Sequence, residues 1–417
     1  MESININLPE DVKKIIRTIE ENGFEAYAVG GCVRDSILGR EPDDWDITTS
    51  ARPEQVKSFF KKTIDTGIKH GTVTVMINHV GYEVTTYRID GEYKDGRHPE
   101  SVEFSAKLVD DLKRRDFTIN AMAYNESHGF VDEFNGISDL NNKVIRCVGD
   151  SVERFSEDAL RMMRAIRFSA QLGFEIEQST YNAIVKLAPS IKQVSMERVQ
   201  VEFLKTILSD NPNYIMEYHK TGLLKENLQY MDELLAGKYA KNVVAMLKYS
   251  KNNTIQRYSA VFNMGEPDKV KAELKALKLD NYTIDTVTKL VKYSKDTIDE
   301  NEPAVREAVH KYGKDMLPLM FDNEEARIST KEEIVGISLK GQRLHLDRIK
   351  QMYDDVITRG DCISIKDLDI TGNDLIEYGL SGVQIGKTLN ALLHIVIENP
   401  KLNEKSTLLA MIEHLEE

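Results

Sequence analysis

YAVGGCVRDSILGREPDDWDITT, residues 27–49, is the stretch from which the fold of this chain can be predicted. The apolar run at 26–29 is typical of a buried strand, and two glycines end it. Residues 33–38 favour a helix, and a second short strand is expected to carry Asp44 and Asp46. Alternate residues of a strand point to the same face, so these carboxylates are expected side by side. A hard divalent cation with oxygen ligands would relieve their mutual repulsion.

The glycine pair between the predicted strand and helix supplies a second feature. Without Cβ atoms, the backbone at Gly30 and Gly31 can approach a ligand closely, and N–H groups at a helix start can bind an anion. Arg34 adds a planar guanidinium for phosphate oxygens, and Asp35 beside it joins the predicted nucleotide-binding set. A phosphate cradle followed by a metal-binding carboxylate pair indicates metal-assisted phosphoryl or nucleotidyl transfer.

The motifs GGCVRD and DDWDIT together resemble the first motif of the polymerase-β-like nucleotidyltransferases. More narrowly, they resemble the branch that contains class II CCA-adding tRNA nucleotidyltransferases and bacterial poly(A) polymerases. The resemblance is dense over 25–210 and diffuse near the C-terminus. It implies an α+β fold, in which a nucleotidyltransferase head with a small mixed sheet is followed by all-α neck, body and tail domains. These four parts are expected at 1–150, 151–210, 211–330 and 331–417.

A second motif lies in residues 113–125, KRRDFTINAMAYN. Taken alone, its paired basic groups beside a carboxylate are compatible with a solvated salt bridge at the start of a basic helix. RRDFTINA nevertheless resembles the second motif of the family almost letter for letter. The resemblance implies that Arg115 meets the nucleotide phosphates, and that Asp116 and Asn120 engage the ribose and order the site.

A third carboxylate is expected on a strand. Residues 72–77 and 82–88 are typical of two paired strands, and Glu83 lies on the second. Its segment, EVTTYR, matches the family's strand at that point, which implies a catalytic role. The alternative is an exposed strand glutamate.

Residues 89–100, IDGEYKDGRHPE, are polar and contain glycine, so they are expected to form a mobile loop. In the family, enzymes that add a complete CCA end keep such a loop, and enzymes restricted to CC have it shortened. The loop looks complete in this sequence, although an ordinary surface loop is the alternative. The residues that carry this comparison are Tyr93, Asp95, Gly96, Arg97 and Pro99.

A single helix is predicted over 156–172, with Ser156 as its N-cap. Ala159, Met162, Met163, Ile166 and Ala170 would form its buried stripe. The charged residues recur every third position along another face, which is usually solvated. EDALRMMRAIRF, however, resembles the family's base-selecting motif. By that resemblance, Asp158 and Arg161 bond to the Watson–Crick edge of CTP or ATP, and Arg164 and Arg167 support the base site or the phosphates.

Three further helices are expected from periodicity, at 9–22, 50–62 and 195–208. In the last of them, Arg198 and Glu202 are spaced to pair at i and i+4. The resemblance extends to this helix, and it implies a structural role for both residues. No other helical stretch beyond residue 210 carries an obvious chemical motif.

The composition of the chain restricts the class of protein to which it can belong. The chain has 417 residues, 41% of them apolar, and no apolar run approaches the length of a membrane span. The N-terminus lacks the features of a signal peptide. Three widely spaced cysteines indicate reduced thiols in a cytoplasmic protein. The net charge of −13 comes from residues 1–150 and 351–417, so RNA would have to bind local basic patches.

The resemblance implies template-independent addition of C, C and A to a tRNA 3′ end from CTP and ATP, with release of pyrophosphate. Asp44 and Asp46, with Glu83, are then expected to hold two Mg²⁺ ions. A bacterial poly(A) polymerase and a CC-adding enzyme are alternatives within the family, and a non-catalytic RNA-binding protein of the same fold is a remote one. The sequence leaves the oligomeric state open.

Overall fold

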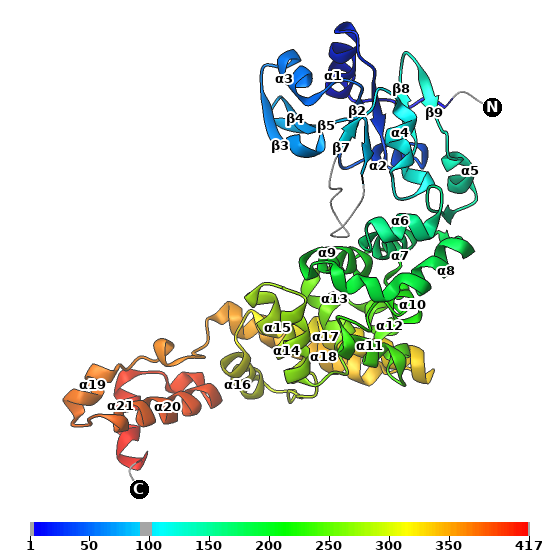
Figure 1. Cartoon of the computed structure of the whole chain (residues 1–417). Helices are drawn as coiled ribbons and strands as arrows, with labels where there is room; N and C mark the ends of the chain where they lie inside the picture. The colour runs from blue at the N-terminus through cyan, green and yellow to red at the C-terminus, as the bar shows by residue number, and fades with distance from the viewer. Residues whose placement is uncertain (1–3, 92–101, 416–417) are drawn as a thin grey trace. The chain divides into compact units, whose positions relative to one another are not determined.

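The computed structural model describes residues 4–91 and 102–415, and the chain divides into two compact units. The first comprises the residues up to Asp232 together with Ala276–Lys278, and the second comprises Glu233–Lys275 and the residues from Leu279 onward. Strands are concentrated in the N-terminal part of the first unit, and the remainder is almost entirely helical (Figure 1). This distribution confirms the predicted α+β class.

A mixed sheet of seven strands forms the centre of the N-terminal part of the first unit, in the order β3-β4-β5-β2-β1-β8-β9. The central strand β1 pairs antiparallel with β2 and β8, whereas β2 runs parallel to β5. All four residues of β1 are buried, as its apolar run predicts. The strands are β1 (Ala26–Val29), β2 (Ile47–Thr49), β3 (Thr63–Gly67), β4 (Thr72–Ile77), β5 (Val80–Thr86), β8 (Ala123–Asn125) and β9 (Gly129–Val131).

The predicted pairing of the strands at 72–77 and 82–88 is confirmed, because β4 and β5 form an antiparallel hairpin. Asn78 and His79 connect them, with φ of 50° and 68°. Two consecutive left-handed residues match the right-handed twist of the flanking strands, which favours a tight hairpin. The second strand starts at Val80, earlier than the sequence predicts.

Two smaller pairings complete the strands. The strand β6 (Arg88–Asp90) pairs with β7 (Val102–Phe104), and β10 (Val144–Ile145) pairs with β11 (Glu175–Ile176). Strand β6 therefore takes up the first part of the predicted 89–100 loop. The residues on which the comparison of loop lengths depends lie outside the described residues: Tyr93, Asp95, Gly96, Arg97 and Pro99.

Helices cover the sheet and continue beyond it. Helix α1 (Glu10–Glu21) confirms the first predicted helix and buries Val12, Ile15, Ile16 and Ile19. Helix α3 (Pro53–Phe59) is shorter than the predicted 50–62, because Phe60 adopts an extended conformation that leads into β3. The other helices of this unit are α2 (Gly31–Ile37), α4 (Leu108–Lys113), α5 (Gly136–Asn141), α6 (Ser151–Glu157), α7 (Leu160–Leu172), α8 (Gln178–Leu187), α9 (Met196–Ile207) and α10 (Ile215–Thr221).

The prediction of one helix over 156–172 is wrong, because the chain breaks between α6 and α7. Asp158 has an extended backbone (φ −141°, ψ 104°), and its Oδ1 accepts a hydrogen bond of 3.0 Å from the Leu160 N–H. Short polar side chains compete with helical hydrogen bonds in this way. Ser156 is not an N-cap, since its hydroxyl donates to the Val152 carbonyl inside α6. The predicted buried stripe of α7 is nevertheless confirmed.

The second unit is helical throughout its described residues. Arg306, which is 3% exposed, ties two of its helices together by donating to the carbonyl oxygens of Ile397 (2.6 Å) and Glu398 (3.2 Å). Helix α11 (Gln229–Ala236) spans the boundary between the units. It is followed by α12 (Ala240–Tyr249), α13 (Thr254–Val261), α14 (Pro267–Ala276), α15 (Asn281–Lys292), α16 (Glu302–Tyr312), α17 (Met316–Val335), α18 (Lys340–Arg359), α19 (Gly372–Tyr378), α20 (Val383–Glu398) and α21 (Lys405–Leu415).

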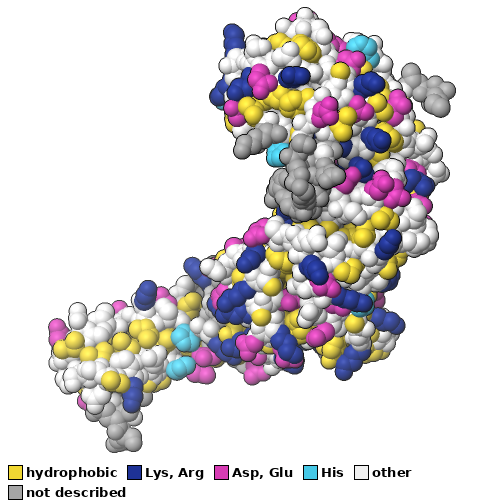
Figure 2. Space-filling view, viewed as in Figure 1, with side chains coloured by type: hydrophobic (Ala, Val, Ile, Leu, Met, Phe, Trp, Pro, Cys, Tyr) yellow, Lys and Arg dark blue, Asp and Glu magenta, His cyan; other side chains and the backbone are white. Residues whose placement is uncertain are grey.

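Apolar clusters hold this unit together. One lies among α16, α17 and α18, and it includes Val309, Phe321 and Leu346. Another buries Leu392 and Val396 of α20 against α19 and α21. On the face shown in Figure 2, basic and acidic side chains are interspersed over the helical part of the chain.

Within residues 4–91 and 102–415, no single helix is long and apolar enough to cross a membrane. The pair α19 and α20 reaches the required length and composition only when taken together, and it is bent by 115°. All three cysteines are free and buried.

Candidate active site

The carboxylate pair does not lie on a strand, because β2 begins only at Ile47. Asp44 and Asp46 lie in the segment that leads into β2, so strand alternation does not determine how their side chains point. The Asp46 carbonyl accepts a hydrogen bond of 3.0 Å from the Val29 N–H, which fixes this segment beside β1. The expectation that both aspartates belong to a strand was wrong.

Glu83 joins the two aspartates through the sheet. Ile47 of β2 is in register with Val84 of β5 in a parallel pair, so the residues immediately before them, Asp46 and Glu83, are at the same level. Both carboxylates are exposed to solvent, yet the surrounding protein raises the pKa of each. For Glu83, desolvation is the largest cause, and the charges of Asp46 and Asp44 add to it.

The pKa of Asp46 is likewise raised by desolvation, with a further increase from Asp44, while Arg115 opposes the rise. No three His, Cys, Asp or Glu side chains form a preformed metal cluster within residues 4–91 and 102–415. The donor chemistry nevertheless fits a hard divalent cation, since oxygen ligands that disfavour each other's ionisation are stabilised by positive charge between them.

The predicted glycine turn is present where the first strand ends. Gly30 has φ of +85° and ψ of −129°, a conformation that favours glycine, and α2 begins directly after it. A Cβ atom at Gly30 would lie 2.8 Å from Nη1 of Arg115. The absence of a side chain therefore lets the Arg115 guanidinium, from the second motif, lie against the backbone of the first.

Arg115 has capacity for a further partner. Its Nη2 lies 3.4 Å from Oδ2 of Asp111, and its buried Nε has no hydrogen-bond partner among the described residues. Asp111 is fully buried and also accepts hydrogen bonds from Arg114 and from the Thr48 hydroxyl. The sequence analysis missed Asp111, although its i, i+3 and i+4 spacing to the two arginines was a signal.

Arg34 is buried and already paired within the protein. Its Nη2 donates to Oδ2 of Asp35 (2.7 Å), and its Nη1 donates to Oδ1 of Asn120 (2.7 Å). Asn120 in turn donates from Nδ2 to Oδ1 of Asp116 (3.1 Å). Asp116 completes the series by accepting from Nε of Arg164 on α7 (2.8 Å). The structure thus joins these five predicted residues in one hydrogen-bonded network.

Asp116 is the central charge of this network. Burial alone would raise the pKa of its carboxyl, but the Arg164 guanidinium and the Asn120 amide outweigh burial and hold that pKa well below its usual range. Asp116 is therefore a stable anion that orients its neighbours.

Helix α7 presents a second cluster centred on Phe168, which the sequence analysis did not single out. The guanidinium carbons of Arg167, Arg34 and Arg164 lie 3.8, 5.1 and 5.2 Å from the centre of its ring. Cations over an aromatic face are attracted by its quadrupole. The signal was its position in EDALRMMRAIRF, one residue after the last arginine.

The predicted pair of Arg198 and Glu202 was wrong. Glu202 accepts from Nε of Arg167 (2.5 Å), and Arg198 donates from Nη2 to Oδ2 of Asp158 (2.7 Å). Although the i, i+4 spacing places the two residues on the same side of α9, each is bonded to a different partner outside the helix. Arg167 is thereby engaged with Glu202, and its support of the base site or the phosphates stays a prediction.

The two predicted base-reading residues flank the break between α6 and α7. Asp158 is paired with Arg198. Arg161 bonds to Glu157 (2.6 Å) and donates to the Arg114 carbonyl (3.1 Å). An incoming base edge would therefore replace or share existing partners of both residues.

Three segments of the chain match known family models. The family models that match are those described as the "Poly A polymerase head domain" at residues 26–146, the "Probable RNA and SrmB-binding site of polymerase A" at 173–235, and domain 2 of tRNA nucleotidyltransferases at 249–412. The three models cover separate segments of the chain. The first segment contains the seven-stranded sheet, and the other two are mainly helical.

Full-length relatives are also similar. The chain is 38% identical to a CCA-adding enzyme of Ligilactobacillus salivarius, covering 97% of this chain and 96% of the relative. It is 38% identical to a CCA-adding enzyme of Listeria monocytogenes, covering 94% of each. Among solved structures, the CCA-adding enzyme of Bacillus stearothermophilus in complex with CTP matches with a TM-score of 0.76 and 30% identity, covering 97% of this chain and 96% of that one.

Proposed function

The chain belongs to the CCA-adding enzymes, which are nucleotidyltransferases, and on this basis we propose that it adds C, C and A to tRNA 3′ ends from CTP and ATP. The single observation that supports this most directly is the network from Arg34 through Asn120 and Asp116 to Arg164. It couples the glycine turn before α2 to helix α7, which carries the proposed base-reading residue Arg161.

In the proposed reaction, the 3′ hydroxyl oxygen of the RNA attacks the α-phosphorus of the nucleotide. A new P–O bond forms, the bond from the α-phosphorus to the bridging oxygen breaks, and pyrophosphate leaves. Nucleotidyltransferases of this family generally use a divalent metal. Bound at Asp44 and Asp46, and at Glu83, two Mg²⁺ ions would neutralise phosphate charge and lower the pKa of the hydroxyl.

Arg115 and Arg34 are proposed to hold the triphosphate. The unpartnered Nε of Arg115 supports this role, because a buried guanidinium nitrogen gains a charge-assisted hydrogen bond from a phosphate oxygen. Gly30 and Gly31 would let the phosphates approach the backbone. Asp116 and Asn120 keep Arg34 in place and are proposed to contact the ribose.

Asp158 and Arg161 are proposed to read the base edge. A carboxylate accepts from an exocyclic amino group, and a guanidinium donates to ring nitrogens or carbonyl oxygens, which are the groups that cytosine and adenine offer. We propose Arg164 as a support of this site. The body at 211–330 and the tail at 331–417 are proposed to hold the tRNA.

The test is incorporation of nucleotide into a tRNA transcript that lacks its CCA end, resolved at single-nucleotide length. With Mg²⁺ present, CTP alone should give two additions, and a third should require ATP. A long ladder with ATP alone would identify a poly(A) polymerase, and a stop after two additions with both nucleotides would identify a CC-adding enzyme. No incorporation under any condition would favour a non-catalytic RNA-binding protein. The Asp46→Asn variant, which is expected to be inactive, gives the background level of the assay.

A further inference from the structure

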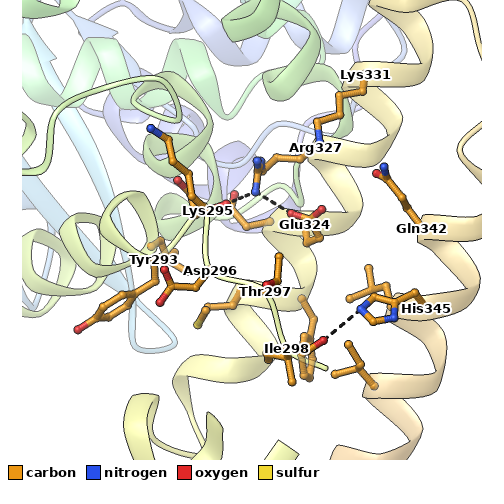
Figure 3. Close-up of a pocket in the computed structure, with 17 residues that line it drawn as sticks. Tyr293, Lys295, Asp296, Thr297, Ile298, Glu324, Arg327, Lys331, Gln342 and His345 are labelled. Atoms are coloured by element: carbon orange, nitrogen blue, oxygen red, sulfur yellow. Dashed lines mark hydrogen bonds and ion pairs between the residues drawn. The ribbon is translucent and has the colours of Figure 1, made fainter. Parts of the chain in front are cut away.

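A separate cavity of about 470 Å³ is lined only by residues of the second unit, and it shares no lining residue with the candidate active site. It is enclosed by the end of α15, the segment 293–298, and helices α17 and α18 (Figure 3). Pockets of a few hundred Å³ are typical of small-molecule sites. Its apolar lining consists of Leu290, Ile298, Met320, Phe321, Leu346 and Ile349.

One polar group in the lining lacks a partner. Asn323 is 4% exposed, and its Nδ2 donates to the Ser259 hydroxyl oxygen (2.8 Å). Its Oδ1 has no hydrogen-bond partner among the described residues. A buried acceptor without a donor costs free energy, so a ligand that supplies an N–H or O–H group would be stabilised there.

The rim of the cavity carries uncompensated positive charge. Lys295 and Lys331 are exposed and have no ion-pair partner in the part of the chain that the structure describes. The nearby acids are engaged elsewhere, since Asp296 bonds to Lys311 (3.1 Å) and Glu324 bonds to Arg327 (2.8 Å). In the view of Figure 3, Lys295, Arg327 and Lys331 lie in the upper part of the cavity, and Ile298 and His345 lie below.

We propose that this cavity binds a nucleotide. The apolar lining suits the faces of a nucleobase, the exocyclic amino group of adenine or cytosine would donate to Oδ1 of Asn323, and the phosphate would lie between Lys295 and Lys331. A fatty acid would satisfy the lysines but leave Asn323 unpaired, and a sugar would leave its hydroxyl groups against the apolar lining. The nucleotide is either free or part of a bound RNA.

This proposal does not depend on the catalytic function, because it rests on residues of the second unit alone. The test uses the full chain and the photoreactive probe 8-azidoadenosine 5′-monophosphate, followed by peptide mapping of the labelled sites. Labelling is expected in the peptides that contain 293–298 and 320–331, and AMP in excess should suppress it. Labelling of peptides from the first unit reports the catalytic site separately.

Two variants test the assignment. Asn323→Leu removes the unpaired acceptor, and the surface double variant Lys295→Glu/Lys331→Glu reverses the rim charge without touching the core. Each should reduce labelling of the cavity peptides about tenfold, which is the loss expected for one buried hydrogen bond in the first variant and for a charge-assisted contact in the second. The matched control is Lys271→Glu, an exposed lysine of α14 outside the cavity, which should leave the labelling unchanged.

A competition series then identifies the source of the nucleotide. Suppression by AMP in excess is expected in either case, because the probe is an analogue of AMP, and failure of AMP to suppress the labelling overturns the proposal. Suppression by AMP alone indicates a free nucleotide, whereas stronger suppression by a short single-stranded RNA than by AMP indicates a nucleotide of a bound RNA. The proposal is overturned if the cavity peptides are not labelled, or if decanoate competes and AMP and RNA do not. It is also overturned if the double variant labels like Lys271→Glu.

Discussion

Asp116 and Arg164, 48 residues apart, form an ion pair in which Nε and Nη2 of the arginine lie 2.8 and 2.6 Å from Oδ2 of the carboxylate. The pair joins the second motif of the head to helix α7. Asp116→Asn removes the charge but keeps the shape, leaving the Arg164 guanidinium, whose side chain is 33% exposed, against a neutral amide. We expect a loss of roughly 2–3 kcal/mol in the free energy of unfolding, reduced from the value for a fully buried pair because Arg164 is partly exposed. Urea denaturation measures it.

A double-mutant cycle isolates the pair. If Asp116→Asn and Arg164→Gln together cost the sum of the two single changes, the residues are not coupled and the ion pair contributes nothing specific. A coupling of about 1 kcal/mol or more is expected for residues in direct contact.

The same pair predicts a dependence of stability on pH. The folded-state pKa of Asp116 lies below its unfolded value, so its contribution is fully present above the unfolded pKa and is lost as pH falls through the folded pKa. The difference in unfolding free energy between wild type and Asp116→Asn should be constant between neutral pH and about pH 5, and shrink below about pH 4. A difference that grows on acidification would contradict the assignment.

Asp46→Asn should separate stability from activity. The folded-state pKa of Asp46 is raised, so its ionisation destabilises the fold once pH rises through that pKa. Without divalent metal, the variant should be more thermostable than wild type at neutral pH, and the two should converge at a pH below the unfolded pKa. Nucleotide incorporation with Mg²⁺ should be lost by at least about a thousandfold.

The control for this experiment is Asp43→Asn, which removes a charge from the same segment. It should retain incorporation. If Asp46→Asn were destabilising at neutral pH, or if it retained incorporation, the Asp46 carboxylate would not belong to a cation-binding site.

Gly30→Ala tests the close approach of the two motifs. The alanine would have to keep the φ of +85° that Gly30 adopts, which is unfavourable for a residue with a side chain. Its Cβ atom would also lie 2.8 Å from Nη1 of Arg115 and displace that guanidinium. Gly23→Ala is a matched control, because Gly23 has the same φ of +85° but no atom within 4 Å of the added Cβ. Both should lose about 1–2 kcal/mol of stability from the backbone conformation.

Only Gly30→Ala should also raise the KM for CTP and ATP, because only there is Arg115 moved. Steady-state kinetics with both nucleotides measure this. Equal KM values in the two alanine variants would show that Arg115 does not hold the triphosphate.

The sequence predicted the features that depend on neighbours along the chain. The strand at 26–29, the turn at Gly30 and the buried stripe of α7 follow from local pattern, and the structure confirms them. The prediction that Asp46 lies on a strand was wrong, because the start of a strand depends on pairing with another strand. In this chain, β2 pairs with β1 and β5 only from Ile47 onward.

Partner choice among the charged residues could not be predicted in the same way. Spacing allowed Arg198 to pair with Glu202 on its own helix, yet each found a partner on or beside another helix. An exposed i, i+4 pair contributes only a few tenths of a kcal/mol. The tertiary contacts are more strongly buried, so they decide the outcome, and the same Arg198 contact holds Asp158 at the break in the predicted helix.

Arg198 therefore positions the carboxylate of Asp158, and its removal should affect nucleotide selection. Its Nη1 and Nη2 lie 3.3 and 2.7 Å from the two carboxylate oxygens, so Arg198→Met would leave the Asp158 carboxylate with only its hydrogen bond from the Leu160 N–H. We expect kcat/KM to fall about tenfold for both CTP and ATP, and the preference between them to change. Arg198→Lys should recover part of the loss, since a lysine keeps the charge but not the two-pronged geometry.

Lys205→Met, which removes an exposed cation from the same helix, is the control and should behave like wild type. A purely structural role would lower the unfolding free energy and leave the ratio of kcat/KM for CTP and ATP unchanged, and that result would remove Arg198 from base selection.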